Sequence, residues 1–164
     1  MISFKEINGD LIKLAKTGEF DLIVHGCNCF CTMGSGIAKQ IKEEFPRAFH
    51  ADSKTIRGDI TKLGNYTFAD EDVPKGGYIM GENEWVKCRI VNCYTQYAFG
   101  TEKIQLDYEA LKLCLRKINW EYRGKHIGLP EIGCKLAGGD WNIVREIIVT
   151  ELKDMEVTIV HYKS

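Results

Sequence analysis

The stretch that constrains the fold most is residues 21–38. It contains an apolar run, then a glycine-bearing turn, and then a helical pattern of apolar residues. The run at 22–24 has the apolar and β-branched content of a buried strand. After the turn Gly34-Ser35-Gly36, three apolar residues recur with helical spacing: Ile37, Ile41 and Phe45. A strand that leads through a glycine loop into a helix points several backbone N–H groups at one place, beside the positive end of the helix dipole. The stretch therefore predicts an anion site, most often one for phosphate.

A second glycine-bearing loop occupies residues 132–141 and follows a short apolar segment at 126–130 that reads as a buried strand. Asp140 is placed to cap a helix whose apolar face carries Trp141, Val144, Ile148 and Leu152. In open α/β sheets, ligands bind outside the carboxyl ends of the strands. Two such loops side by side could hold the two phosphates of a diphosphate, which is a stronger inference than either loop alone.

The remaining pattern alternates strands and helices without repeats or linkers. Strands are predicted near 1–8, 20–25, 85–94, 126–130 and 157–160, and one or two more are predicted over 66–80 around a turn at 74–77. The best helix signal covers 102–118. Helices of ten residues or more between strands imply a mixed, mainly parallel sheet that is covered on both faces. At 164 residues, we expect one domain over the whole chain, 1–164.

The composition bounds the partners and the compartment. The 22 basic and 23 acidic side chains are balanced, whereas binding to a duplex nucleic acid needs clustered Lys and Arg. No apolar run approaches the roughly 18 residues of a membrane helix, and the polar N-terminus does not resemble a signal peptide. Seven cysteines are an odd number, so we expect free thiols in a reducing compartment such as the cytoplasm.

Four segments together resemble the macro domain, a module that binds ADP-ribose. They are residues 8–11, 24–28, 34–38 and 129–134 with 138–141, and they occur in the order of that family over nearly the whole chain. The resemblance implies a three-layer α/β/α fold with a mixed sheet of about six strands. Within the superfamily, the motifs are most similar to the branch of the yeast ADP-ribose 1″-phosphate phosphatase. The terminal ADP-ribose glutamate hydrolases form the other near branch.

The resemblance also implies roles for single residues. Asp10 matches the acid that accepts a hydrogen bond from the adenine amino group, and Leu11 would line the base pocket. Asn28 matches the asparagine that binds the distal ribose. The first loop would wrap the distal ribose and its phosphate side through Gly34, Ser35, Gly36 and Ile37. The second loop would lie over the diphosphate through Gly133, Cys134, Lys135, Leu136 and Ala137.

Two residues are candidates for catalysis. His25 matches a histidine of the phosphatases and could donate a proton to a departing ribose oxygen. Asp140 could orient a water molecule or the imidazole. The alternatives are a buried core histidine and a plain helix cap. The nucleophilic lysine of the glutamate hydrolases falls at Gln96 here and their aspartate at Ala137, so covalent lysine chemistry is not expected.

The leading hypothesis is that the chain binds ADP-ribose and removes the phosphate of ADP-ribose 1″-phosphate, without a cofactor. The alternatives are a non-catalytic reader of free or macromolecule-linked ADP-ribose and an ADP-ribosyl hydrolase that uses a positioned water. No metal site is expected. Cys27, Cys29 and Cys31 alternate along an extended segment about 7 Å apart, too far for one tetrahedral ion. Tyr94, Tyr97 and Phe99 form an aromatic cluster at a strand end; we expect them to pack in the core or in loops, with the alternative that one of them lies against the distal ribose.

Overall fold

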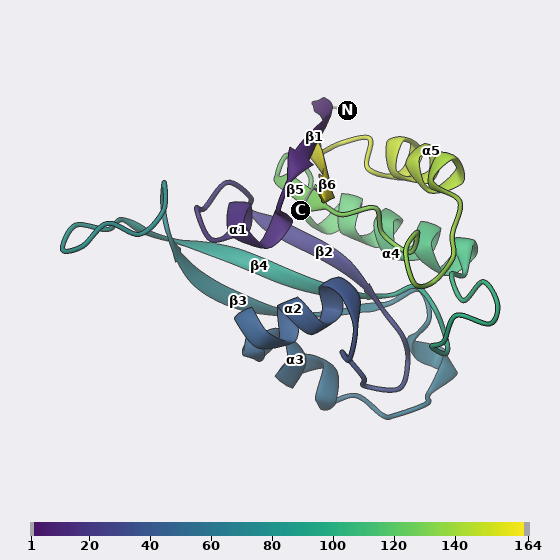
Figure 1. Cartoon of the computed structure of the whole chain (residues 1–164). Helices are drawn as coiled ribbons and strands as arrows, with labels where there is room; N and C mark the ends of the chain where they lie inside the picture. Colours follow the sequence, from purple (N-terminus) through teal and green to yellow (C-terminus); the bar gives the residue numbers. More distant parts are fainter. Residues whose placement is uncertain (1, 163–164) are drawn as a thin grey trace.

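The computed structural model describes residues 2–162 and shows one six-stranded sheet between two layers of helices (Figure 1). The strands are β1 (Ser3–Gly9), β2 (Leu22–Cys27), β3 (Tyr66–Pro74), β4 (Trp85–Tyr94), β5 (His126–Leu129) and β6 (Glu156–Tyr162). Their order in the sheet is β1-β6-β5-β2-β4-β3. Only β3 runs antiparallel to its neighbour, β4, among these strands. The predicted mixed, mainly parallel sheet is confirmed.

Two separate apolar cores lie on the two faces of the sheet, because successive side chains of a strand point to opposite sides. In β2, Leu22 and Val24 pack into the core covered by α4 (Tyr108–Glu121) and α5 (Trp141–Glu151). On the other face, Ile23 and Cys27 pack into the core covered by the remaining helices. These are α1 (Leu11–Ala15), α2 (Gly36–Glu44) and α3 (Pro46–Ser53), with a short 3-10 helix at Ile60–Lys62. The three-layer α/β/α arrangement is confirmed.

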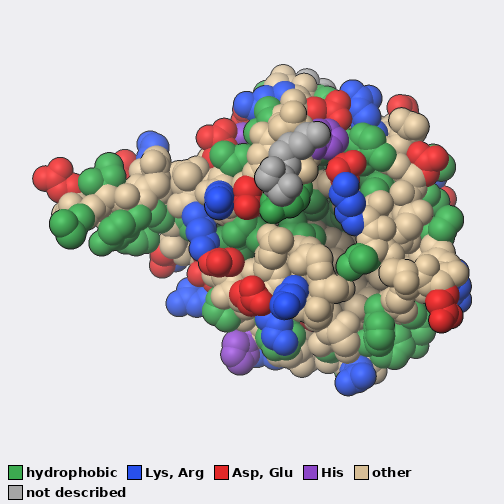
Figure 2. Space-filling view, viewed as in Figure 1, with side chains coloured by type: hydrophobic (Ala, Val, Ile, Leu, Met, Phe, Trp, Pro, Cys, Tyr) green, Lys and Arg blue, Asp and Glu red, His purple; other side chains and the backbone are tan. Residues whose placement is uncertain are grey.

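Two predicted elements differ from the observed ones. Helix α4 begins at Tyr108 rather than at 102, because Asp107 accepts a hydrogen bond from the N–H of Ala110 and so caps the helix there. Of the one or two strands predicted over 66–80, one forms, and it ends at Pro74, where the predicted turn begins. Beyond it, the chain forms an arm, residues 75–84, that projects from the sheet and carries exposed hydrophobic side chains at its tip (Figures 1 and 2).

Among the described residues, no helix is long and apolar enough to cross a membrane.

Candidate functional site

A cleft of about 710 Å³ runs along the edge of the sheet where the parallel strands end. It is lined by residues that lie at or just after the carboxyl ends of β1, β6, β5, β2 and β4: Asp10, Tyr162, Pro130, Asn28 and Gln96. Neighbouring strands lie about 4.8 Å apart, so a cleft that crosses five of them is about 19 Å long. Its volume falls within the range of small-molecule and cofactor sites.

The first glycine loop forms one wall of this cleft. Gly34, Ser35, Gly36 and Ile37 all line it, and helix α2 begins at Gly36. Gly36 has a φ of 58°, a left-handed conformation that favours glycine. Ser35 occupies the N-cap position, yet its side chain makes no capping hydrogen bond within the described part of the chain. The serine hydroxyl and the first amides of α2 are therefore available to an anion.

The second glycine loop forms the opposite wall, through Gly133, Lys135, Leu136 and Ala137. Its fold depends on Gly133 and Gly139, whose backbones lie close together: the N–H of Gly139 donates to the carbonyl of Gly133 at 2.8 Å. A Cβ on Gly139 would lie 2.4 Å from Leu106 Cδ2 and 2.7 Å from that carbonyl oxygen. Only glycine fits this tight turn.

The two loops face each other across the cleft. A Cβ built on Gly36 would lie 3.4 Å from Cδ1 of Leu136, so the Leu136 side chain lies close to Gly36, a hundred positions away in the chain. Backbone amides thus approach the same space from both sides. Such an arrangement suits a diphosphate, whose two groups need donors on more than one side.

At the β1 end of the cleft, the Asp10 carboxylate caps α1 and also lines the cleft. Its Oδ1 accepts hydrogen bonds from the N–H groups of Ile12 and Lys13, both at 3.1 Å. The other oxygen, Oδ2, accepts none from the described residues. Asp10 can therefore serve as a cap and accept a further hydrogen bond from a ligand. Leu11 lines the same end but is otherwise buried in the core.

At the β4 end, two carboxamides line the cleft. Asn28 is fixed by its own loop: its Oδ1 accepts from the N–H of Phe30 at 2.8 Å, and its Nδ2 donates to Thr32 Oγ1 at 2.7 Å. One N–H and one lone pair of this amide remain for a ligand. Gln96 donates from Nε2 to the carbonyl of Ala98 at 2.7 Å, which leaves its Oε1 as an acceptor at the cleft.

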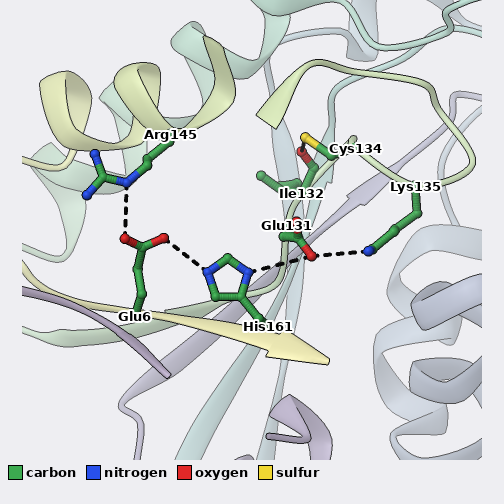
Figure 3. A network of polar contacts seen from close by, with 7 residues as sticks. All are labelled: Glu6, Glu131, Ile132, Cys134, Lys135, Arg145 and His161. Carbon is green, nitrogen blue, oxygen red and sulfur yellow. Dashed lines mark hydrogen bonds and ion pairs between the residues drawn. The ribbon is translucent and has the colours of Figure 1, made fainter. Parts of the chain in front are cut away.

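A chain of charged residues runs from Arg145 to Lys135 and reaches the cleft lining at Glu131 and Lys135 (Figure 3). Glu131 lines the cleft, and its Oε2 lies 3.2 Å from Lys135 Nζ and 3.6 Å from His161 Nδ1. The opposite ring nitrogen of His161 lies 3.0 Å from Glu6, which also accepts a hydrogen bond from Arg145 at 3.1 Å. Partial burial alone would raise the pKa of Glu6, but the hydrogen bonds from His161 and Arg145 lower it. Glu131 was not among the residues singled out in the sequence, although it lies two residues after the end of β5, at the edge where ligands bind.

A family model, the Macro domain, matches residues 24–148, which include both glycine loops. The chain belongs to the macro domain family. The predicted family is thereby confirmed.

Three curated proteins are similar to this macro domain in sequence. An uncharacterised 17.5 kDa protein from the tk–vs intergenic region of enterobacteria phage T4 is 35% identical over 97% of this chain and 96% of its own length. A DNA ADP-ribosyl glycohydrolase of Mycobacterium tuberculosis is 26% identical over 93% of this chain, which spans 40% of that enzyme's length. An ADP-ribose 1″-phosphate phosphatase of Aspergillus oryzae is 44% identical, over 29% of this chain and 22% of its own length.

Solved structures share the fold. The macrodomain of Thermus aquaticus DarG has a TM-score of 0.68 and 20% identity, and 98% of each chain is covered. Thermosipho africanus DarTG, solved in complex with ADP-ribose, has a TM-score of 0.70 and 17% identity over 99% of this chain and 42% of its own. At these identities, the likeness shows the macro domain architecture alone.

His25 does not line the cleft of this macro domain. Its side chain is fully buried on the face covered by α3, where one ring nitrogen, Nε2, lies 2.6 Å from Asn92 Oδ1. Asn92 in turn donates to the carbonyl of Ala48 in α3. Burial lowers the pKa of His25 to about 4, against the opposing effect of the Asn92 hydrogen bond. This placement is that of the alternative, a buried core histidine, and it gives the predicted catalytic role of His25 no support from the cleft lining.

Asp140 and Cys134 also lie outside the cleft lining. The Asp140 carboxylate accepts a hydrogen bond from the N–H of Asn142 at 2.8 Å, so it caps α5, and its own N–H donates to the hydroxyl of Tyr108. The Cys134 side chain turns toward the core beneath α5, where burial, together with the nearby charges of Glu131 and Asp140, raises its pKa to about 11. The geometry therefore supports the cap at Asp140, whereas a ligand contact by the backbone of Cys134, within the second glycine loop, stays a prediction.

The other predicted ligand-binding residues do line the cleft: Asp10, Leu11, Asn28, Gly34, Ser35, Gly36, Ile37, Gly133, Lys135, Leu136 and Ala137. Whether each contacts a ligand stays a prediction. Lys135 is held by Glu131 and is the one lysine among the described residues of the lining. In residues 2–162, no group of three or more His, Cys, Asp or Glu side chains could hold a metal ion.

Proposed function

We propose that this macro domain binds ADP-ribose along the cleft and hydrolyses the bond that joins C1″ of its distal ribose to a macromolecule. The observation that carries the binding is the approach of the two glycine loops, with the Leu136 side chain of the second loop close to Gly36 of the first. The diphosphate would lie between them. The adenine would lie at the β1 end, where Asp10 Oδ2 can accept its amino group, and the distal ribose at Asn28.

Two observations favour release of a macromolecule over release of phosphate. The glycohydrolase relative is similar over 93% of this chain, whereas the phosphatase relative is similar over a 48-residue stretch. In addition, His25, the group that would protonate a departing phosphate-bearing oxygen, lies in the core. The phosphatase hypothesis thereby loses its candidate acid.

The reaction would be a plain hydrolysis. Water adds to C1″ while the bond from C1″ to the leaving atom breaks; that atom keeps the bonding electrons and takes up a proton, and free ADP-ribose is released. Asn28 and Gln96 are carboxamides, which orient water and ribose hydroxyls but do not take up a proton at neutral pH. The rate enhancement would therefore come from positioning and from amides that hold the diphosphate, and we expect a slow enzyme.

The test presents the purified protein with three substrates: ADP-ribose on a nucleobase of a short oligonucleotide, ADP-ribose on a glutamate side chain of a protein, and ADP-ribose 1″-phosphate. Chromatography measures free ADP-ribose, and calorimetry measures the affinity for ADP-ribose itself. We expect micromolar binding and release from a macromolecule, with Asn28→Ala reducing turnover and Asn142→Ala, an exposed asparagine of α5, leaving it unchanged.

Other results would decide between the alternatives. Binding without turnover of any substrate would make the protein a reader of ADP-ribose. Phosphate release from ADP-ribose 1″-phosphate alone would restore the phosphatase hypothesis. No binding of ADP-ribose at millimolar concentration would contradict the whole proposal.

A further inference from the structure

Two residues in unusual environments meet beside the segment that joins β2 to the first glycine loop. Cys31 has a φ of 57° and is the one non-glycine residue with a positive φ among those described. This left-handed conformation is strained for a residue that carries a Cβ. Lys62, the last residue of the 3-10 helix, is only 8% exposed. Lysine side chains are rarely this buried unless an opposite charge pairs with them, so both environments need an explanation.

The Lys62 ammonium has hydrogen-bond acceptors but no ion-pair partner. Its Nζ donates to Thr55 Oγ1 at 2.9 Å and lies 3.7 Å from the sulfur of Cys31. It also lies 5.3 Å from the centre of the Tyr94 ring. No carboxylate of the described residues lies within 4.0 Å of it, and the buried Asp52 carboxylate accepts from the Tyr94 hydroxyl instead. A negative charge on the Cys31 sulfur would supply the missing partner.

The Cys31 sulfur is held next to this ammonium and is partly exposed. It lies 3.3 Å from Thr55 Oγ1, and it donates weakly to the carbonyls of Asp52 and Thr55 at 3.4 and 3.6 Å. Cysteines that react readily lie in partly exposed, electropositive surroundings. A small oxidant can therefore reach the sulfur, and the amine of Lys62 is close enough to react with the oxidised product.

The other cysteines lack this combination of exposure and a neighbouring cation. Most of them are buried: Cys27, Cys29, Cys88, Cys93 and Cys114. Cys134 is partly exposed, but burial together with the charges of Glu131 and Asp140 raises its pKa to about 11. Within residues 2–162, no lysine or arginine nitrogen lies within hydrogen-bond distance of any of these sulfurs. Cys31 is therefore the thiol at which oxidation is expected first.

We propose that Cys31 and Lys62 form an oxidative modification site, in which hydrogen peroxide oxidises the thiol and the lysine captures the product as a sulfenamide. In the first step the sulfur bonds to one peroxide oxygen while the O–O bond breaks, which yields a sulfenic acid and water. In the second step the Lys62 amine, after losing a proton to water, attacks the sulfur. The S–N bond forms, the S–O bond breaks, and the oxygen leaves as water. The sum consumes one peroxide, one thiol and one ammonium and yields the sulfenamide, two waters and a proton; sulfur supplies the two electrons that the peroxide accepts.

The S–N bond would connect the loop after β2 to the 3-10 helix that precedes β3. The loop also carries Thr32, whose hydroxyl accepts the hydrogen bond from Asn28 at the cleft. A cross-link between positions 31 and 62 restricts the unfolded chain, so the oxidised protein should unfold at a higher temperature. Formation of this bond requires no ADP-ribose, so the inference does not depend on the proposed function.

The experiment treats the purified protein with a stoichiometric amount of hydrogen peroxide at mildly alkaline pH. It measures the intact mass, the number of free thiols and the tryptic peptides, all without a reductant. We expect the mass to fall by two hydrogens, one of the seven thiols to disappear, and one peptide to join Cys31 to Lys62. Dithiothreitol should restore the original mass. Lys62→Arg keeps the positive charge and should stop the reaction at the sulfenic acid, which a dione reagent traps on Cys31.

Matched variants identify the two reacting residues. Cys134→Ser removes the other partly exposed thiol and should keep the cross-link, whereas Cys31→Ser should abolish it. If Cys31→Ser folds poorly, Cys31→Gly also removes the thiol and suits the left-handed backbone. Loss of two thiols per chain to a disulfide would overturn the inference, and so would oxidation of Cys31 in the wild type without a bond to Lys62. A loss of two hydrogens that persists in Cys31→Gly or in Lys62→Arg would overturn it as well.

Discussion

His25 and Asn28 lie three positions apart on one segment, yet only Asn28 reaches the cleft. His25 lies within β2, where the alternation of the strand turns its side chain toward α3. Asn28 follows the last residue of β2, so its side chain is free of that alternation and takes part in a turn instead. Whether a polar side chain lies inside the strand or just after its end thus decides whether it packs in the core or can contact a ligand.

The depressed pKa of His25 predicts a dependence of stability on pH. In the unfolded chain, His25 takes up a proton near its ordinary pKa of 6.5, whereas in the folded protein it does so only near 4. Between these values the unfolded state binds more protons, so the free energy of unfolding falls as the pH drops from 6.5 to about 4, by about 3 kcal/mol in total. Urea unfolding of the wild type and of His25→Gln at pH 7 and pH 5 measures this.

His25→Gln should lose that share of the pH dependence and, once folded, should bind ADP-ribose like the wild type. His50→Gln, at an exposed position of α3, serves as the matched control and should keep the pH dependence. A loss of turnover in a fully folded His25→Gln variant would instead restore the catalytic role.

Gly139 offers a second prediction at the scale of one residue. A methyl group there would collide with Leu106 and with the carbonyl oxygen of Gly133, so the second loop would have to shift. We expect Gly139→Ala to weaken ADP-ribose binding at least roughly tenfold and to destabilise the protein by about 1–3 kcal/mol. Gly34→Ala is the control for stability, because a Cβ at Gly34 meets no atom within 4 Å. Thermal unfolding and calorimetry on both variants would measure the two effects.

At the scale of elements, the start of α4 was harder to derive from the sequence than the start of α5. The periodicity near 102–118 indicated a helix, but it did not show that Asp107 caps it and that the residues before this cap pack against the second glycine loop, where the N–H of Gln105 donates to the carbonyl of Ala137. The Asp140 cap of α5 was correctly placed by its position before an amphipathic segment. Caps depend on one side-chain hydrogen bond, whereas periodicity depends on a whole face.

Substitutions of Asp140 can test whether its carboxylate only caps α5 or also takes part in catalysis. Asp140→Ala removes the hydrogen bond to Asn142 and should cost about 1 kcal/mol of stability, while Asp140→Asn should keep most of it. If the carboxylate only caps α5, both folded variants hydrolyse substrate at the wild-type rate. Equal loss of activity in both variants, with unchanged thermal unfolding of Asp140→Asn, would contradict this assignment.

At the scale of the whole molecule, the sequence predicted the sheet, both glycine loops and the covering of both faces, because each depends on a local pattern. The meeting of the loops across the cleft depends on the strand order, which no local pattern contains; the family resemblance indicated it. The orientation of Cys134 and the charged chain from Arg145 to Lys135 depend on packing between distant segments. They could not be derived before the fold was known.

The arm between β3 and β4 lies at the end of the sheet opposite the cleft, since β4 begins at Trp85 beside the arm and ends at Tyr94 near the cleft. The N–H of Lys75 donates to the carbonyl of Glu84 at the base of the arm. After deletion of residues 78–82, a short, glycine-containing loop would still connect these two residues. We expect the affinity for ADP-ribose to stay within about twofold and the thermal unfolding temperature to change little. A tenfold loss of affinity would show that the arm acts on the cleft.

The first and last strands of the chain are neighbours in the sheet, with Ser3 paired to Glu156 and Gly9 to Tyr162. Asp10 and Tyr162 consequently lie at the same end of the cleft. An adenine bound there would contact residues that follow β1 and end β6, and it would stabilise the pairing of these two strands. Because a ligand that binds only the native state suppresses opening by mass action, amide hydrogens in β1 and β6 should exchange with solvent more slowly once ADP-ribose is present. Slower amide exchange in the two terminal strands would thus report that the site is occupied.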